Sequence, residues 1–195
     1  MIALIDYGAG NVASVANALS ELGHNFTITN KENEICMADK VIFPGVGEAS
    51  FAIKQLHKLN LYSFLRIIKR PILGVCLGLQ LMADFSTEGN ITCLGIFPGN
   101  VLKFDPEKVK VPHMGWNDIH FKKESKLFSG IKEGERFYFA NSYYLPVNEF
   151  TTSYSTNSID FAASMEKDNY YGVQFHPEKS SDAGLRVLKN FVELC

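Results

Sequence analysis

Hydrophobic positions in the first half of the chain alternate between short apolar runs and longer helical patterns. The short runs, which are typical of strands, are residues 2–5, 26–29, 41–43 and 72–75. Apolar residues recur at helical spacing over 12–22, 48–69 and 77–82, and Gly23 is a fitting stop signal for the first of these helices. Repeated strand–helix units imply parallel strands with right-handed crossovers, so we expect a layered α/β sheet.

The second half of the chain has a different pattern. Short segments rich in aromatic and β-branched residues are separated by Gly, Pro, Asn and Asp, as in residues 136–145, 151–155 and 161–165. These segments favour antiparallel strands. A final helix is predicted over 182–194. The expected fold class is α/β, with a mostly parallel central sheet flanked by helices and a smaller antiparallel portion, and residues 1–195 are expected to form a single domain.

Composition narrows the function classes. A chain of 195 residues that is 46% hydrophobic can bury a sizeable core. Its net charge of -2 and the lack of a basic stripe argue against nucleic-acid binding. No apolar stretch approaches a membrane span, and residues 1–11 resemble a first strand rather than a signal peptide. The four cysteines are scattered and form no metal-ligand pattern, so we expect a reduced, cytoplasmic protein without a metal.

The strongest chemical signal is the segment Gly74-Val75-Cys76-Leu77-Gly78, which lies between a predicted strand and a predicted helix. This is the nucleophile-elbow pattern with cysteine in place of serine. Glycines on either side allow the tight turn that exposes the sulfur. The helix that follows favours a thiolate, and the N–H of Leu77 is placed to stabilise an oxyanion. The ordinary alternative is a buried structural cysteine.

His176-Pro177-Glu178 supplies what a thiol nucleophile needs. The segment follows a predicted strand at 171–175, and proline keeps the local chain extended. Residues two apart in an extended chain share a face, so the imidazole and the carboxylate can lie side by side. We therefore expect Cys76 to be the nucleophile, His176 its base, and Glu178 the acid that orients the base.

Two glycine-rich loops follow predicted strands. Residues 43–47 end in Gly45-Val46-Gly47, whose N–H groups can turn toward a developing oxyanion. The segment from Gly8 to Ala13 matches the dinucleotide-binding fingerprint, with Glu32 about 20 residues further on. Against that alternative, Asp6 and Tyr7 place a charge and a bulky ring before the first glycine. The second half also lacks continued βαβ units.

Three segments resemble the class I, triad-type glutamine amidotransferases: GVCLGLQ at 74–80, FPGVG at 43–47 and GVQFHPE at 172–178. The resemblance covers the chain essentially from end to end. DYGAGN at 6–11 and PHMGWN at 112–117 resemble, more narrowly, the glutaminase subunits of imidazole glycerol phosphate synthases. The resemblance implies that L-glutamine is hydrolysed through a thioester at Cys76. The ammonia would then pass to a cyclase subunit with a (β/α)₈ barrel, for histidine biosynthesis. It implies no cofactor.

The resemblance also assigns roles to individual positions. Residues implied to hold glutamine or its oxyanion are Gly45, Val46, Gly47, Leu77, Gln80, Ser142 and Tyr143. Those implied to face the partner are Asn11, Trp116 and Lys179. The family usually has a histidine where this chain has Asn141, so a second acceptor stays open, such as a surface-sugar synthase served by a paralogous subunit. A non-catalytic scaffold of the same fold is a further alternative, and the intact Cys76, His176 and Glu178 argue against it.

Overall fold

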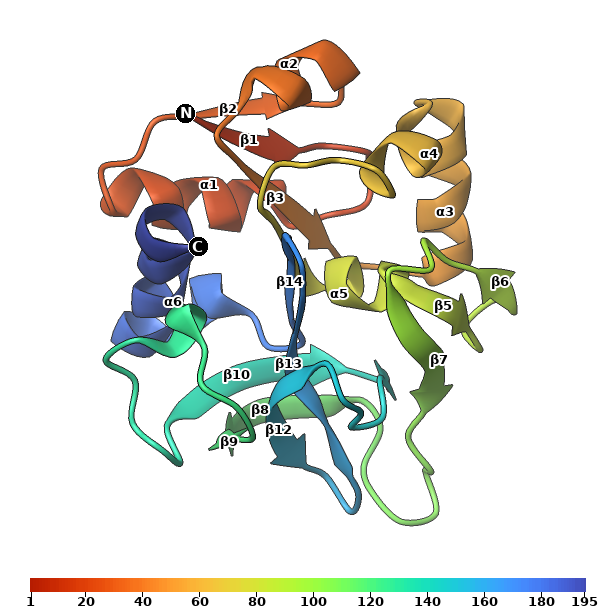
Figure 1. Ribbon diagram of the computed structural model, residues 1–195. Coiled ribbons are helices and arrows are strands. Elements are labelled where there is room, and N and C mark those ends of the chain that lie inside the picture. Colours follow the sequence, from red (N-terminus) through yellow and green to blue (C-terminus); the bar gives the residue numbers. More distant parts are fainter.

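The computed structural model describes residues 1–195 and is built around one eight-stranded sheet with helices on both faces (Figure 1). The strand order is β2-β1-β3-β4-β14-β13-β12-β9. The first five strands in that order run parallel, and the last three are added antiparallel. Their bounds are β1 Ile2–Ile5, β2 Phe26–Thr29, β3 Lys40–Gly45, β4 Ile72–Cys76, β9 His120–Phe121, β12 Thr151–Thr156, β13 Asp160–Lys167 and β14 Tyr170–Val173.

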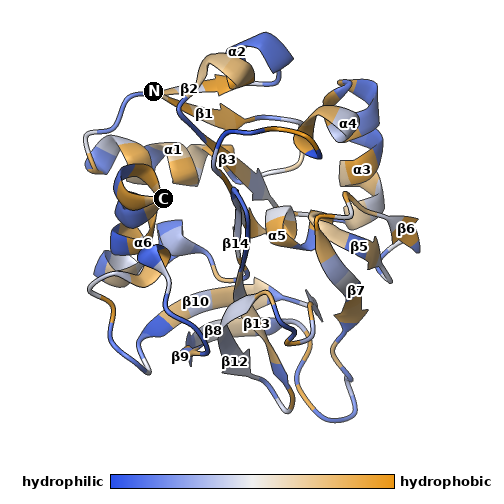
Figure 2. Cartoon of the chain, in the orientation of Figure 1, coloured by the Kyte–Doolittle hydropathy of each residue, from blue (hydrophilic) through white to orange (hydrophobic).

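Two hydrophobic cores lie on the two faces of this sheet. Because successive side chains of a strand point to opposite faces, Ile2 and Leu4 belong to one core, and Ala3 and Ile5 to the other. Helices α1 (Val12–Glu21) and α6 (Ser181–Leu194) cover the first core, whereas α2 (Glu32–Met37), α3 (Ala49–Lys58) and α4 (Leu61–Leu65) cover the second. Figure 2 shows a hydrophobic and a hydrophilic side on both α1 and α6, as expected for helices that cover a core with one side and face solvent with the other.

Two smaller sheets extend the molecule beside the main one. One has the order β11-β7-β5-β6, and the other pairs β10 with β8. Their strands are β5 Ala83–Ser86, β6 Ile91–Thr92, β7 Phe97–Lys103, β8 His113–Asp118, β10 Arg136–Asn141 and β11 Tyr143–Tyr144. A five-residue helix, α5 (Leu77–Leu81), follows β4, and single 3₁₀ turns lie at Lys126–Phe128 and Pro177–Lys179.

The expected fold class is confirmed, but several element boundaries differ. The helix predicted over 48–69 is two helices, because Asn60 adopts a left-handed conformation with φ of 59° between α3 and α4. The strand predicted over 136–145 is interrupted at Ser142, which separates β10 from β11. Helix α2 was not expected, since its six residues contain a single buried side chain, that of Ile35.

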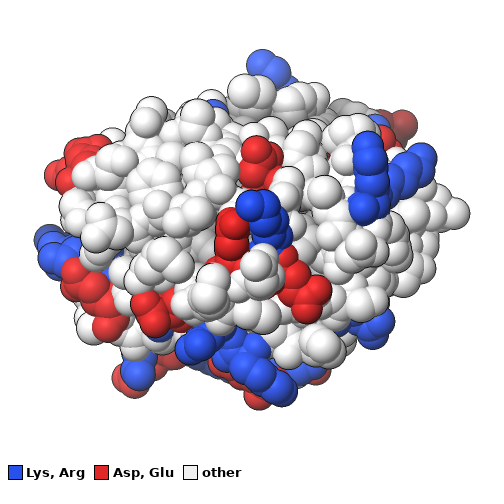
Figure 3. Space-filling view, turned by 90° about the horizontal axis from the view of Figure 1, so that it is seen from above, with Lys and Arg blue, Asp and Glu red and all other residues white.

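The surface carries charges of both signs. Figure 3 shows acidic and basic side chains interspersed over the face seen from above, without one extended field of a single sign. This distribution agrees with the small net charge of -2. None of the helices is both long enough and apolar enough to span a bilayer.

Candidate active site

Cys76 ends strand β4 and lies in the sharp turn that leads into α5. Its φ of 54° and ψ of -109° are unusual for a residue with a side chain. Such backbone strain costs on the order of 1–3 kcal/mol and persists only where the surrounding structure imposes it. A Cβ atom on Gly78 would lie 2.0 Å from the carbonyl oxygen of Phe43, and one on Gly74 would lie 2.8 Å from backbone atoms of α5. Gly74 is therefore required by the turn itself, and Gly78 by the close approach of α5 to strand β3.

His176 lies beyond the end of β14, beside Cys76. Its Nδ1 atom is 2.9 Å from Oε1 of Glu178, and the side chain of Glu178 is only 1% exposed. Burial by itself would lower the pKa of His176. The hydrogen bonds and negative charges of Cys76 and Glu178 outweigh that effect and raise the pKa to about 10. At neutral pH the raised pKa favours the imidazolium form of His176, paired with the buried carboxylate of Glu178.

A compact pocket of about 240 Å³ brings together most residues that the sequence singled out. Of those residues, the pocket is lined by Val46, Gly47, Cys76, Leu77, Gln80, Ser142, Tyr143, His176 and Lys179. Glu178 lies behind His176 and reaches the pocket only through the imidazole ring. A small, largely preformed cavity with several convergent polar groups is the usual form of a site for a small substrate.

Oxyanion donors are available on two sides of the pocket. Leu77 is the first residue of α5, where helix N–H groups have no intrahelical partner. Gly47 adopts a φ of +100° and lines the pocket together with the exposed Val46. Gly45 is different, because it is buried within β3 and paired with Cys76. A Cβ on Gly45 would lie 2.7 Å from the backbone nitrogen of Gly78, so glycine is needed at this position for strand β3 to pack closely against α5.

Gln80 and Tyr143 form one wall of the pocket. The side-chain amide of Gln80 donates to the carbonyl oxygen of Tyr143 over 2.8 Å. The same carbonyl accepts a 2.9 Å hydrogen bond from the side-chain amide of Asn141, which is 5% exposed. Asn141, the position that departs from the family pattern, therefore lines the pocket and holds the carbonyl of Tyr143 in place.

Glu88 is a pocket residue that the sequence reasoning missed. It lies in the turn between β5 and β6, and its carboxylate accepts a 2.9 Å hydrogen bond from the N–H of Ala49. Burial and the nearby Glu48 raise the pKa of Glu88 above the ordinary value of 4.5, although the Ala49 hydrogen bond opposes the rise. The only sequence signal was an acidic residue immediately before the Gly89-Asn90 turn. A half-buried carboxylate here suits a substrate with an ammonium group.

The three residues expected to face a partner do not all lie in the pocket. Lys179 lines it, with its Nζ 6.0 Å from the ring centre of Tyr138. Trp116 is 43% exposed on β8 and packs edge-on against Tyr138, with ring centres 6.2 Å apart. Asn11 is partly exposed at the start of α1 and does not line the pocket. Trp116, Tyr138 and Lys179 thus form a continuous exposed rim beside the pocket.

The dinucleotide alternative fails on local geometry. Gly8 and Gly10 do connect a strand to a helix, as the fingerprint requires. Glu32, however, lies in the first turn of α2 rather than at the end of β2, where such an acid would reach a ribose. The 2% exposed side chain of Tyr7 also packs beneath the loop against Phe43, with ring centres 5.2 Å apart.

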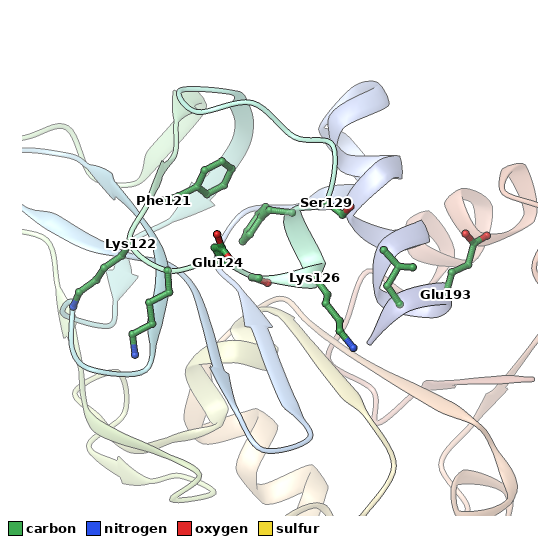
Figure 4. Close-up of a pocket in the computed structure, with 10 residues that line it drawn as sticks. Phe121, Lys122, Glu124, Lys126, Ser129 and Glu193 are labelled. Atoms are coloured by element: carbon green, nitrogen blue, oxygen red, sulfur yellow. The ribbon is translucent and has the colours of Figure 1, made fainter.

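A second cavity, of about 910 Å³, lies elsewhere, between the segment after β9 and the end of α6 (Figure 4). Its charged side chains diverge: Lys122 and Lys126 point in different directions. The Nζ atoms of Lys122 and Lys123 donate to the carbonyl oxygens of Asn148 and Glu149. Without convergent polar groups, this cavity has no chemistry comparable to that of the smaller pocket.

Comparison with known proteins gives one consistent result. Residues 3–195 match the family model of the class-I glutamine amidotransferases. The chain is 50% identical to the imidazole glycerol phosphate synthase subunit HisH of Bacteroides fragilis strain YCH46, over 99% of each chain. It is 43% identical to the subunit of the same name from Archaeoglobus fulgidus, over 100% of this chain and 98% of that one.

Solved structures agree at the level of the fold. A crystal structure of a glutamine amidotransferase superposes with a TM-score of 0.76 at 16% identity and covers 100% of this chain and 98% of that one. The structure of PurLQS from Thermotoga maritima gives a TM-score of 0.72 at 16% identity and covers 98% and 96% of the two chains.

Proposed function

Because this chain belongs to the class-I glutamine amidotransferases, we propose that it hydrolyses L-glutamine in the pocket that contains Cys76 and His176. It is the glutaminase subunit of imidazole glycerol phosphate synthase and serves histidine biosynthesis, in line with its HisH relatives at 41–50% identity. These relatives favour the histidine pathway over the surface-sugar alternative. The four cysteines are free thiols, which suits a reducing cytoplasm.

The observation that carries the catalytic proposal is that Cys76 and His176 line one pocket, with Glu178 2.9 Å behind the imidazole. The Cys76 thiolate attacks the side-chain amide carbon of glutamine. The imidazolium of His176 then gives its proton to the amide nitrogen, so ammonia leaves and a glutamyl thioester remains. Water attacks the thioester with His176 as base, which releases glutamate and restores the thiolate.

Substrate recognition follows from the walls of the pocket. The N–H groups of Leu77 and of the Val46–Gly47 loop stabilise the oxyanion of the tetrahedral intermediate. Gln80, Ser142 and Tyr143 hold the polar groups of glutamine. Glu88, whose carboxylate is half-buried in the pocket, pairs with the α-ammonium group of the substrate. No step requires a cofactor or a metal.

The ammonia acceptor is bound by a second subunit, a cyclase with a (β/α)₈ barrel. Ammonia that escaped into neutral water would be protonated to ammonium, which is not a nucleophile, so direct transfer between subunits is favoured. The rim of Trp116, Tyr138 and Lys179, with the exposed Met114 on the same strand as Trp116, is the docking surface nearest the pocket. Asn11, at the start of α1, faces the same partner.

The test is glutamate release with the cyclase subunit and acceptor nucleotide present, followed by an acid quench and mass spectrometry of the Cys76 peptide. A glutamyl adduct on Cys76, absent in Cys76→Ala, is expected. The exposed Cys36 in the same sample is the internal control and should carry no adduct. Glutamine hydrolysis without an adduct on Cys76, or with equal rates in Cys76→Ala, would overturn the proposal.

A further inference from the structure

Gln174 is a buried polar residue next to the active site that has no role in the mechanism described above. It follows β14 directly and precedes His176 by two residues. Its exposure is 0%, and its backbone N–H donates to the carbonyl of Ala163 over 2.8 Å. A glutamine side chain so deeply buried must find hydrogen-bond partners, because an unsatisfied buried amide costs about 1–3 kcal/mol.

The partners of this side chain are the nucleophile and a wall of the pocket. Oε1 of Gln174 accepts a 2.8 Å hydrogen bond from Nε2 of Gln80, and Nε2 of Gln174 lies 3.6 Å from Sγ of Cys76. The thiol of Cys76 also donates to the carbonyl oxygen of Ala140 over 4.0 Å, and it hydrogen-bonds the imidazole of His176. Gln174 therefore offers Cys76 a side-chain N–H donor from within the protein interior.

The orientation of the two amides is fixed by a backbone group. The carbonyl oxygen of Tyr143 can only accept, so the NH₂ group of Gln80 must face it, at 2.8 Å. The second hydrogen of that NH₂ group points to Gln174, which must then present its oxygen. The remaining NH₂ group of Gln174 faces the sulfur. Reversing the amide of Gln174 would place two donors against each other.

We propose that Gln174 is a further catalytic residue of the proposed glutaminase reaction, whose side-chain N–H stabilises the Cys76 thiolate. A neutral thiol is a weak acceptor, whereas an anionic sulfur forms a charge-assisted hydrogen bond, so the contact favours the anion. The hydrogen bond strengthens when the thiolate is released from the thioester and weakens when the thioester forms. Gln174 transfers no proton, since the proton of the thiol moves to His176.

Alkylation of Cys76 by iodoacetamide tests this inference without relying on glutamine hydrolysis. Gln174→Met keeps the length of the side chain and removes the donor. In the variant, the alkylation rate of the Cys76 peptide at about pH 7 should fall about tenfold, because thiolates and not thiols react. At about pH 10, where hydroxide removes the thiol proton without help, the two rates should converge. The exposed Cys36 should react equally fast in both proteins.

Steady-state kinetics supply the second readout. Because Gln174 does not line the pocket, Gln174→Met should lower kcat of the complex with its cyclase subunit and leave KM for glutamine within about twofold. Gln174→Leu serves as the second variant if Gln174→Met does not fold. An unchanged alkylation rate of Cys76, or a loss equal at both pH values, overturns the role of Gln174. Absence of glutaminase activity in the unsubstituted protein overturns the proposed function instead and leaves the alkylation result standing.

Discussion

Nδ1 of His176 lies 2.9 Å from Oε1 of Glu178, and the two side chains are 4% and 1% exposed. The second carboxylate oxygen, Oε2, is buried and has no hydrogen-bond partner. The imidazole is thus the only hydrogen-bond partner of this carboxylate. Because Glu178 occupies Nδ1, the Nε2 atom of the ring is left to face Cys76, which fixes the tautomer of the neutral base.

Glu178→Gln should keep the fold and lower kcat for glutamine hydrolysis at least about tenfold, with a smaller effect on KM. The neutral amide can still hold the ring, but it no longer stabilises the imidazolium. The anion also helps to raise the pKa of His176 to about 10, so its removal should shift the alkaline limb of the kcat/KM profile to lower pH. A rate profile measured from about pH 6 to about pH 10.5 provides the test.

The pH dependence of the folding stability follows from the same rise in the pKa of His176. A histidine whose pKa is raised on folding contributes stability that is fully present below its unfolded pKa of 6.5 and is lost as pH rises through about 10. The loss of stability in Glu178→Gln should therefore be largest below about pH 6.5 and should shrink as pH rises toward about 10. Glu107→Gln, an exposed carboxylate in the loop after β7, is the matched control. If Glu178→Gln changed only the KM for glutamine and left kcat unchanged, the role of Glu178 in orienting and charging His176 would be contradicted.

Glu88→Gln should raise KM for glutamine at least about tenfold and leave kcat nearly unchanged, because an amide cannot pair with the α-ammonium group. In the unsubstituted protein, KM should also rise as pH falls through the pKa of Glu88, which burial raises above 4.5. The variant should lack this pH dependence. Equal KM values for the two proteins at about pH 8 would remove Glu88 from the substrate site.

Cys76→Ala should abolish glutamine hydrolysis while the partner's reaction continues with added ammonium salts. Alanine changes only the sulfur, and both glycines of the elbow remain, so the fold and partner binding should persist. Cys93→Ala, at a buried cysteine outside the pocket, is the control and should still hydrolyse glutamine. Glutamate release by Cys76→Ala near the unsubstituted rate would exclude Cys76 as the nucleophile.

Tyr7→Phe should leave the free energy of unfolding unchanged or raise it by up to about 1 kcal/mol, because the buried hydroxyl of Tyr7 has no hydrogen-bond partner. Tyr170→Phe is the matched comparison. Its hydroxyl donates to the carbonyl of Leu65 over 3.1 Å, so its loss should cost about 0.5–1.5 kcal/mol. Urea unfolding of both variants tests the contrast. Equal losses would mean that the Tyr7 hydroxyl has a partner in solution.

The sequence was most informative where one local rule determines the geometry. The elbow at Cys76 could be predicted because its turn leaves no room for a Cβ at Gly74, which would meet the backbone of Gly78, a constraint that acts over four residues. The helix break at Asn60 could not, because α3 and α4 both pack on the same core and so continue one apolar pattern across the break. Local periodicity therefore indicated a single helix there.

The pocket walls depend on contacts between distant segments, which periodicity does not record. Glu88 reaches the pocket only because the turn after β5 packs against the start of α3, where Ala49 donates to its carboxylate. Gln174 meets Gln80 across 94 residues of chain. Each is a polar residue beside a strand or turn, and sequence position alone does not distinguish it from a solvated one.

The last prediction concerns activation by the partner. The isolated chain should hydrolyse glutamine weakly, because hydrolysis without an acceptor wastes the substrate. The liganded cyclase should raise the rate at least about tenfold, or roughly 1.4 kcal/mol of transition-state stabilisation. The structure offers a direct route: the backbone N–H of His176 donates to the carbonyl of Tyr138 over 2.8 Å, and the Tyr138 ring lies close to both Trp116 and Lys179.

A partner that contacts Trp116 or Lys179 therefore acts on the residue that positions His176. Trp116→Ala and Lys179→Ala should each reduce the activation by the partner. Because Trp116 lies outside the pocket, Trp116→Ala should leave the weak basal rate of the isolated chain nearly unchanged. Met37→Ala and Lys58→Ala, at exposed positions on α2 and α3, are the matched controls and should be activated normally. Glutamate release is measured with the chain alone, with the cyclase, and with the cyclase plus acceptor nucleotide. Full activity in the isolated chain would refute the switch, and normal activation of Trp116→Ala would place the docking surface elsewhere.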